Sequence, residues 1–293
     1  MPSPPEILEI PLPAVTLSAL AWGPAGGPLV VALHGFPDTA WTWRHLGPHL
    51  AERGFRVVAP HSRGYQPSGL AHDGCYHAAA LMSDAVGVHE ALGGDDRAVL
   101  VGHDWGAITA NGLGANAGSP YRRIVSMAVP PFPLLADRVP ARVLARQARL
   151  SWYTLFNQVP RVPERHLERL VRHLWATWSP GYDAGEDVAR VLVSLAAPEH
   201  RSAAIGYYRA ALRQWRVPDA YRSFADSWTA MPTVPTLLLH GADDGCLQAA
   251  YAERGRGQLP PGSELVVVPA SGHFLQLERP DLVNRLVTDF VEA

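Results

Sequence analysis

The chain has 293 residues and a net charge of −2, with 47% hydrophobic and 18% charged residues. These values are typical of a globular protein with a substantial core, and they give no reason to expect nucleic acid or an anionic membrane as a partner. All 25 basic residues are arginine, so the absence of lysine excludes a Schiff-base mechanism and a P-loop.

The cysteine count and the chain's start indicate a compartment. Two cysteines, Cys75 and Cys246, are too few for a disulfide framework and favour a reducing, cytoplasmic location. The first residues lack the basic and apolar regions of a signal peptide, and no apolar run approaches the ~20 residues that span a bilayer. No group of histidines has metal-ligand spacing, so we expect neither a metal nor a cofactor. The oligomeric state, monomer or homodimer, stays open.

Short apolar runs bounded by glycine and proline are typical of buried strands. We expect strands at Leu29–Leu33, Arg56–Ala59, Ala98–Val101, Ile124–Ala128, Thr236–Leu239 and Glu264–Val268, with a further strand near an edge at Val15–Ala21. Segments with helical spacing lie between several of them, as at Thr42–Arg53 and Tyr76–Leu92. Strands that alternate with helices predict an α/β fold with a mostly parallel sheet.

This alternation stops between residues 130 and 230, where helix-like segments occur without a strand-like run. These segments are Ala141–Gln158, Glu164–Trp178, Glu186–Ala196 and Ala203–Trp215. We therefore predict a core of residues 1–129 and 231–293 with an inserted helical cap of residues 130–230. The cap holds ten of the eighteen Trp and Tyr residues, which is typical of a cap–core interface. Arg138, Arg142, Arg146 and Arg149 share one helical face, which is more typical of a solvated surface than of an anion site.

The segment Gly102-His103-Asp104-Trp105-Gly106 follows an apolar run and precedes a helix-like stretch. This is the strand–turn–helix context of the nucleophile elbow G-x-S-x-G, with aspartate in place of serine. A carboxylate that attacked an acyl carbon would give a reactive anhydride, whereas it can displace a leaving group from an sp³ carbon and form an alkyl ester. An aspartate at such a junction, taken alone, is more often a helix N-cap.

Two further segments change that interpretation. Asp243 and Asp244 follow the predicted strand Thr236–Leu239, and His273 follows the strand at 264–268. The order nucleophile, acid, histidine is that of the α/β-hydrolases. Because adjacent side chains diverge, only one of the two aspartates should reach His273.

A fourth element lies after the strand Leu29–Leu33. The glycine-containing turn there can aim the backbone N–H of Phe36 at a neighbouring site. Together with the N–H of Trp105 it would form an oxyanion hole, which stabilises negative charge on a carbonyl oxygen.

Over essentially its whole length the chain resembles the α/β-hydrolase superfamily, and within it the soluble epoxide hydrolases. The matching motifs are His34-Gly35-Phe36-Pro37-Asp38, Ser62-Arg63-Gly64-Tyr65-Gln66-Pro67-Ser68, Gly102-His103-Asp104-Trp105-Gly106 and Gly272-His273-Phe274. The resemblance implies an α/β-hydrolase fold with an inserted helical cap, and a small apolar epoxide and water as substrates. It also selects Asp244 over Asp243, because the family places the acid three residues after the glycine.

The same resemblance implies two cap tyrosines as ring-opening acids. Tyr153 lies in a segment similar to the first tyrosine motif of the family, and Tyr207-Tyr208-Arg209 is similar to the second, with Tyr208 preferred over Tyr207. The expected reaction forms a vicinal diol in two steps. Asp104 attacks an epoxide carbon to give an alkyl ester, and a water activated by His273, which Asp244 orients, then hydrolyses that ester.

Haloalkane dehalogenase is the main competing function, because it needs the same nucleophile, acid and histidine. Its halide leaving group requires N–H donors, which Trp105 and one of three cap tryptophans would supply, namely Trp152, Trp175 or Trp178. Phe36 stands where the dehalogenases usually carry asparagine, which favours the epoxide.

Two more functions fit the residues less well. A fluoroacetate-type dehalogenase needs arginines just after the nucleophile, where this chain has Trp105 and Ile108. A non-catalytic ligand-binding protein of the same fold has no need for the set of Asp104, Asp244 and His273.

We expect structural rather than catalytic roles for His34, His103, His240 and Cys246. His34, His103 and His240 lie beside glycines at strand ends, where they are expected to hydrogen-bond to loops or pack beneath the site. Cys246 follows Asp244 closely, and without a feature that would activate a thiolate we expect it to be a small packed side chain.

Overall fold

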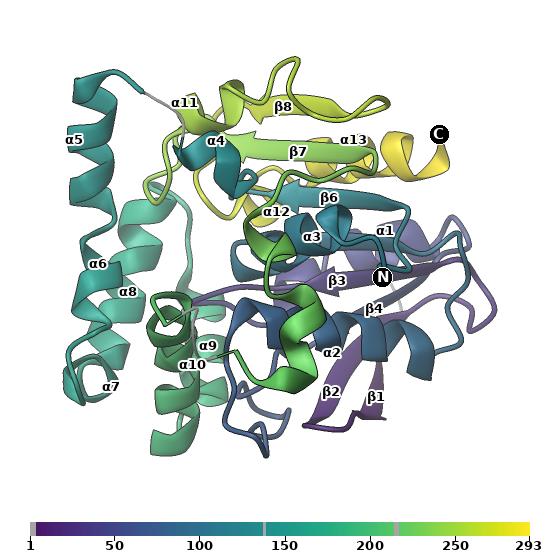
Figure 1. The fold of residues 1–293 in the computed structure, drawn as a ribbon, viewed down its shortest axis with the longest axis horizontal. Helices are drawn as coiled ribbons and strands as arrows, with labels where there is room; N and C mark the ends of the chain where they lie inside the picture. The colour runs from purple at the N-terminus through teal and green to yellow at the C-terminus, as the bar shows by residue number, and fades with distance from the viewer. Residues whose placement is uncertain (1–3, 137–138, 214–216) are drawn as a thin grey trace.

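The computed structural model describes residues 4–136, 139–213 and 217–293, and its described strands form one mixed sheet (Figure 1). The strand order is β1-β2-β4-β3-β5-β6-β7-β8. The strands are β1 (Glu6–Pro11), β2 (Thr16–Trp22), β3 (Leu29–Leu33), β4 (Arg56–Pro60), β5 (Val99–His103), β6 (Arg123–Met127), β7 (Thr236–Gly241) and β8 (Glu264–Val268). β2 pairs antiparallel with β1 and β4, and the other pairs are parallel. The predicted α/β fold is therefore confirmed.

The central strands are continuous apolar runs because helices cover both faces of the sheet. In β3, Val31 and Leu33 pack into one core layer, whereas Val30 and Ala32 pack into the layer on the opposite face. The first layer holds side chains of α2 (Ala78–Ala91) and α3 (Trp105–Ala115), and the second those of α1 (Leu46–Ala51) and α13 (Pro280–Glu292). The sheet thus supplies a rigid platform on which loops at the strand ends are fixed.

Helices fill the described residues between β6 and β7. They are α4 (Phe132–Ala136), α5 (Ala141–Leu150), α6 (Trp152–Phe156), α7 (Val162–Arg165), α8 (Leu167–Trp178), α9 (Gly185–Ser194) and α10 (Pro198–Ala211), followed by the 3₁₀ segments η3 (Asp219–Phe224) and η4 (Ser227–Thr229). The other short elements are η1 (Ala40–Trp43), α11 (Ala249–Glu253) and α12 (Leu275–Glu278). Figure 1 shows α5 to α10 gathered at one end of the sheet. The exact division into core and cap stays a prediction.

Some element predictions need correction. The sequence did not predict β1, which forms one edge of the sheet, whereas the strand expected near an edge at Val15–Ala21 is observed as β2, second from that edge. β1 is hard to recognise because Ile10 is its only buried residue. The helix expected over Thr42–Arg53 divides into η1 and α1.

Two cap predictions differ at their ends. The helix expected to begin at Ala203 begins at Pro198, because proline suits the first turn of a helix, where no intrahelical partner is needed for its nitrogen. Trp215, the expected end of that helix, and Arg138 of the arginine face lie outside the described residues.

Polar contacts fasten the cap helices to the core. Arg44 donates to both carboxylate oxygens of Asp187 on α9, at 2.7 and 3.1 Å, and Tyr182 donates to the same carboxylate at 2.8 Å. Trp175 on α8 donates its indole N–H to the Pro37 carbonyl at 2.8 Å. A planar guanidinium bound by two parallel hydrogen bonds fixes orientation as well as distance. These contacts hold α8 and α9 over the ends of the strands.

None of the helices in the described residues has the length and apolar character needed to cross a membrane.

Candidate active site

Asp104 lies in a strained turn between β5 and α3. Its backbone has φ 54° and ψ −114°, an unfavourable conformation for a residue with a Cβ. The turn is tight because its two glycines leave room for backbone. A Cβ on Gly102 would lie 2.0 Å from the Gly106 carbonyl oxygen, and one on Gly106 would lie 2.1 Å from the Leu33 carbonyl oxygen. The observed geometry is therefore that of the nucleophile elbow, with a carboxylate at its apex.

The loop after β3 presents a backbone N–H group to this carboxylate. The Phe36 N–H donates to Asp104 Oδ1 at 2.7 Å. Gly35 permits the approach, because a Cβ there would lie 2.2 Å from Asp104 Oδ1 and 2.6 Å from the Trp105 nitrogen. The Trp105 N–H opens α3 and so belongs to the first turn, whose N–H groups have no intrahelical acceptor. The structure places both N–H groups predicted for the oxyanion hole beside Asp104.

His273 lies between two carboxylates. Its Nδ1 is 2.9 Å from Asp244 Oδ2, and its Nε2 is 3.7 Å from Asp104 Oδ2. The other oxygen of Asp244 accepts the N–H groups of Cys246 and Leu247 at 2.7 and 2.9 Å. Asp243 is exposed, so Asp244 is the aspartate that orients the imidazole. Nε2, buried and without a hydrogen bond to the described residues, faces the nucleophile.

The two carboxylates control the protonation of His273. Burial alone would lower its pKa, but the charges of Asp244 and Asp104 outweigh burial and raise the pKa to about 10. The imidazole is therefore protonated at neutral pH. If Asp104 became a neutral ester, part of the stabilisation of the imidazolium would be lost, and the pKa of His273 would fall. The site can thus convert a charged histidine into a base.

The two cap tyrosines are buried beside the nucleophile. The Tyr208 ring lies edge-on to Phe36 and Trp105, each with a centroid distance of 5.3 Å. The Tyr153 ring lies edge-on to Tyr208 at 5.6 Å. Burial, reinforced by the Asp104 carboxylate, raises the pKa of both phenols well above the usual range. Both are therefore protonated donors at neutral pH.

The two neighbouring tyrosines on α10 have different surroundings. The Tyr207 hydroxyl donates to the Arg63 carbonyl at 2.7 Å. The Tyr208 hydroxyl is buried, and none of the described residues accepts a hydrogen bond from it. Tyr208 is thus the one of the pair with a free donor beside Asp104.

Cys246 contacts the site more closely than the sequence indicated. Its Sγ lies 3.4 Å from the Tyr153 hydroxyl, while its N–H binds Asp244. Burial raises the pKa of the thiol well above its usual value, so it is protonated. The sequence could not show this contact, because Tyr153 and Cys246 are 93 positions apart.

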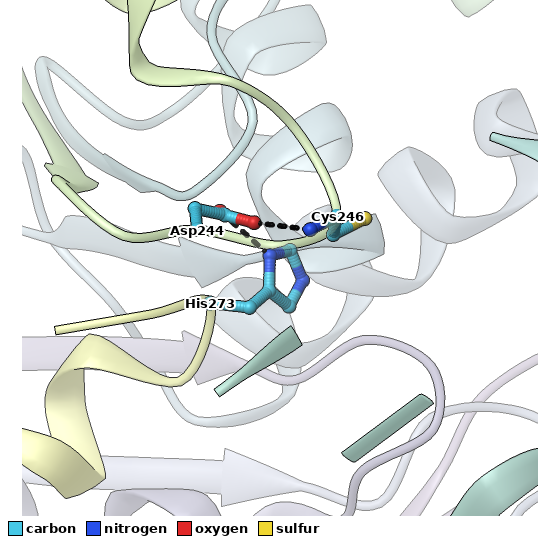
Figure 2. Close-up of side chains that lie close together, drawn as sticks. All are labelled: Asp244, Cys246 and His273. Atoms are coloured by element: carbon cyan, nitrogen blue, oxygen red, sulfur yellow. Dashed lines mark hydrogen bonds and ion pairs between the residues drawn. The ribbon is translucent and has the colours of Figure 1, made fainter. Parts of the chain in front are cut away.

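Figure 2 shows Cys246 beside Asp244 and His273, with one potential ligand atom of each residue within 4.8 Å of the others. A metal would have to displace the hydrogen bond between Asp244 and His273 and deprotonate the thiol. The cluster is better described as a hydrogen-bonded support for the imidazole, and the expectation of no metal stays a prediction.

A further contact missed by the sequence comes from the C-terminal end of α8. The Trp178 carbonyl accepts the N–H of His273 at 3.0 Å and that of Gly245 at 3.1 Å. The Ser179 hydroxyl accepts the Phe274 N–H at 3.1 Å. Carbonyls at a helix C-terminus have no intrahelical partner, so they are available for such contacts. One end of α8 therefore holds the loops of both the acid and the histidine.

The three cap tryptophans considered as halide donors lie differently. Trp175 already donates its N–H to Pro37, and its ring stacks on Phe274 at 3.5 Å. Trp152 is 41% exposed and packs against His173 on the outer side of the cap. Trp178 packs edge-on against His273 at 4.8 Å, so it is the one of the three beside the predicted triad.

Other buried histidines make the structural contacts expected of them. His34 Nδ1 lies 2.9 Å from the Gly35 carbonyl, and its Nε2 accepts the Ser62 N–H. His103 Nε2 is 2.9 Å from the His273 carbonyl, and His240 Nε2 is 2.8 Å from the Leu247 carbonyl. Burial lowers the pKa of His34 to about 4. Burial, aided by a neighbouring imidazole, lowers the pKa of both His61 and His103 to about 3.

These pKa values predict acid destabilisation. Between pH 6.5 and about 4 the unfolded chain binds protons at His34, His61 and His103 that the folded chain rejects. Each histidine then lowers the free energy of unfolding by up to about 1.4 kcal/mol per pH unit as the pH falls. Asp38 offsets the effect of about one of these histidines. Burial raises the pKa of Asp38 to about 8, so the folded state holds a proton that the unfolded chain has released, and this stabilises the fold as the pH falls. His273 does not contribute to this pH dependence of stability, since below pH 6.5 its imidazole is protonated in both the folded and the unfolded chain.

Thermal unfolding of His61→Asn and of the unaltered protein, measured from neutral to acid pH, checks this prediction. The loss of Tm on acidification should be smaller for His61→Asn. The exposed His72 gives a matched control, so His72→Asn should leave the slope unchanged. Parallel slopes for all three proteins would contradict the assignment of His61 as a buried neutral imidazole.

The geometry can be compared with known proteins. The model of the alpha/beta hydrolase fold family matches residues 28–280. Epoxide hydrolase 4 of Mus musculus is 29% identical over 93% of this chain and 75% of its own length. Epoxide hydrolase A of Mycobacterium tuberculosis is 26% identical over 94% of both chains. The structure of a Klebsiella pneumoniae protein superposes with a TM-score of 0.84, at 25% identity over 98% of both chains. The match over most of the length, joined to the elbow, acid and histidine at the strand ends, shows that this chain belongs to the alpha/beta hydrolase fold family.

Proposed function

We propose that the protein is an epoxide hydrolase that opens a small apolar epoxide to a vicinal diol through an alkyl ester on Asp104. The observation that carries this proposal is a carboxylate at the elbow that lies beside an imidazole held by a second carboxylate, with the buried phenol of Tyr208 packed on the neighbouring Trp105 and that of Tyr153 packed on Tyr208. The relatives from Mus musculus and Mycobacterium tuberculosis carry the name epoxide hydrolase, which supports the same reaction class.

The first step is displacement at carbon. A carboxylate oxygen of Asp104 attacks one epoxide carbon, and the C–O bond of the ring breaks with its electron pair on the ring oxygen. Tyr153 and Tyr208 hydrogen-bond that oxygen and give it a proton. Because the raised pKa of both phenols keeps them protonated, the donor is present when the alkoxide forms. The His273 imidazolium then supplies the proton that converts the phenolate back to the phenol.

The second step is hydrolysis of the ester. Once Asp104 is esterified and His273 has lost its proton, the neutral imidazole removes a proton from water while Asp244 holds Nδ1. The hydroxide adds to the ester carbonyl carbon. The N–H groups of Phe36 and Trp105 stabilise the oxyanion, an effect on the order of 3 kcal/mol per donor in acyl chemistry. The bond from that carbon to the alkyl oxygen then breaks with its electron pair on that oxygen, the alkoxide takes the proton of the newly added hydroxyl, and the diol leaves with Asp104 restored as a carboxylate.

Haloalkane dehalogenation remains the second candidate, because it uses the same triad. Of the three cap tryptophans, Trp175 donates to Pro37 and Trp152 lies on the outer side of the cap, so Trp178 beside His273 is the one that could join Trp105 as a halide donor. The groups that disfavour a halide are the phenols. The two phenols near Asp104 instead suit an oxygen leaving group that needs a proton.

To test this, the same preparation of the protein is incubated separately with styrene oxide and with a haloalkane of similar size. We expect diol formation from the epoxide and no halide release. The double variant Tyr153→Phe with Tyr208→Phe should lose the diol activity, whereas Tyr207→Phe, a matched change beside it, should retain it if folded. Halide release without diol formation would select the dehalogenase, and ligand binding unaffected by Asp104→Ala without any turnover would select a non-catalytic role.

Cys246 is expected to orient Tyr153. Cys246→Ala removes the Sγ contact at 3.4 Å, and the loss of one hydrogen bond should slow ester formation about fivefold. Cys246→Ser keeps a donor and acceptor there and should restore most of the rate. Stopped-flow measurement separates ester formation from hydrolysis, and only the former should change. Cys75→Ala, which alters the other buried cysteine, is the control, and an equal effect there would refute a positioning role.

A further inference from the structure

The outer side of the cap exposes a row of apolar side chains. Leu144 is 60%, Trp152 41%, Leu155 71% and Val159 43% exposed. Leu144 and Ala148 are four residues apart on α5, and Trp152 and Leu155 are three apart on α6, spacings that place each pair on one side of its helix, while Val159 lies in the bend after α6. α5 and α6 follow each other at Ser151 along the edge of the molecule (Figure 1). We call Leu144, Ala148, Trp152, Leu155 and Val159 the cap stripe.

α5 is held to the core by polar bonds rather than by apolar packing. None of its residues is buried. Gln147 donates to the Cys246 carbonyl, and Gln248 donates to the Val143 carbonyl, each at 2.8 Å. These bonds attach α5 to the core through the Gln147 side chain and the Val143 carbonyl, while Leu144 stays 60% exposed. A helix gains most of its stability in proteins from burying an apolar face. The cap stripe is therefore the face that a partner can still bury.

A groove of about 490 Å³ runs beside the cap stripe, between α6 and α8. Apolar Trp152, Phe156 and Leu170 line it, and Arg169 and His173 add polar groups. The apolar surface thus continues from the cap stripe onto α8 with a basic side chain next to it.

The charge of this part of the chain is opposite to that of the whole. Residues 141–178 contain seven arginines and two glutamates, a net charge of +5, so the remaining residues carry a net −7. All seven arginines are exposed. Both glutamates are already paired, Glu164 with Arg209 and Glu168 with Arg172. Arg142, Arg146 and Arg149 on α5 make no ion pair with the described residues. The net charge of −2 conceals this asymmetry.

We propose that the cap stripe and its surrounding arginines dock the protein on the surface of an anionic lipid bilayer. The guanidinium groups would bind lipid phosphates, while Leu144, Trp152 and Leu155 enter the boundary between headgroups and acyl chains. A second copy of this chain fits less well, because two surfaces of net charge +5 would face each other. The proposal replaces the expectation, drawn from net charge alone, that no anionic membrane is a partner.

Docking would bring a substrate dissolved in the lipid close to the candidate active site, which lies on the inner side of the same helix. Tyr153 on α6 is buried, whereas Trp152 and Leu155 beside it are exposed. An apolar epoxide dissolved in lipid would then lie about one helix diameter, ~10 Å, from the site. This consequence rests on the proposed function, but membrane binding itself does not.

Co-sedimentation with vesicles tests the proposal without any assay of catalysis. Vesicles of equal parts phosphatidylcholine and phosphatidylglycerol are compared with vesicles of phosphatidylcholine alone, at low and high salt. We expect binding to the anionic vesicles only, weakened by salt because screening shortens the range of the arginine charges. The triple variant Arg142→Gln, Arg146→Gln and Arg149→Gln should bind to these vesicles at least about tenfold more weakly than the unaltered protein.

Two matched controls isolate the surface. Arg53→Gln, Arg256→Gln and Arg285→Gln remove the same charge from exposed core positions and should not change binding. Leu144→Ser with Leu155→Ser should weaken binding, whereas Ile7→Ser with Val193→Ser, also exposed, should not. Thermal unfolding confirms that each variant is folded. Equal losses in test and control variants, equal binding to neutral vesicles, no binding at all, or lipid-free dimerisation that Leu144→Ser with Leu155→Ser abolishes would each overturn the proposal.

Discussion

Asp104→Asn is expected to lower diol formation on the order of 10⁴- to 10⁶-fold, the scale typical of removing a covalent nucleophile. The amide keeps an oxygen that can accept the Phe36 N–H, as Oδ1 does at 2.7 Å, so the fold should persist. An amide oxygen is, however, a very weak nucleophile toward carbon. Steady-state diol formation from an epoxide measures the effect.

The exposed Asp243 supplies the matched control for this change. Asp243→Asn makes the same chemical alteration at an acid that the structure places away from His273, so its activity should be unchanged. Substantial activity in Asp104→Asn, with a folded protein, would refute the role of Asp104 as nucleophile.

His273→Gln is expected to form the ester and then stop. The nucleophile, the phenols and the backbone donors are intact in this variant, but the base that activates water is missing, a loss on the order of 10²- to 10⁴-fold in the second step. Mass spectrometry after incubation with an epoxide should show a mass increase on the peptide that contains Asp104. The His273 proton also contributes to the first step, so ester formation should be slower than in the unaltered protein.

His103→Gln is the control, because His103 packs against His273 with ring centroids 4.8 Å apart yet does not face the nucleophile. It should turn over without accumulating ester. If His273→Gln opened the epoxide but left Asp104 unmodified, the two-step scheme would be wrong.

The sequence predicted the sheet well because its buried strands are short apolar runs. β3 and β8 occupy the predicted residues. β1 could not be found in this way, because an edge strand with one buried residue carries almost no apolar pattern. The helix break at Ser151 is likewise invisible to periodicity, since the apolar residues keep a spacing of three or four positions across it.

The candidate site likewise contains residues that the sequence could predict and contacts that it could not. Asp104, Asp244 and His273 were predictable because each follows a strand of a known fold in a known order, and the ends of parallel strands meet at one edge. The contacts of Cys246 with Tyr153, and of the Trp178 carbonyl with His273, join loops to cap helices distant in sequence. Such contacts depend on how the cap packs on the core, which no local pattern encodes. The surface charge of the cap was visible in the sequence, but its coincidence with exposed apolar side chains was not.

We expect an oxygen of Asp104, and not of water, to become bonded to the epoxide carbon. A single turnover in ¹⁸O-labelled water, with enzyme in excess over epoxide, tests this directly. We predict that the diol contains no ¹⁸O and that the peptide containing Asp104 gains the label, because water attacks the carbonyl carbon of the ester. A diol that carries ¹⁸O after one turnover, with Asp104 unlabelled, would show that water opens the ring directly and would contradict the account.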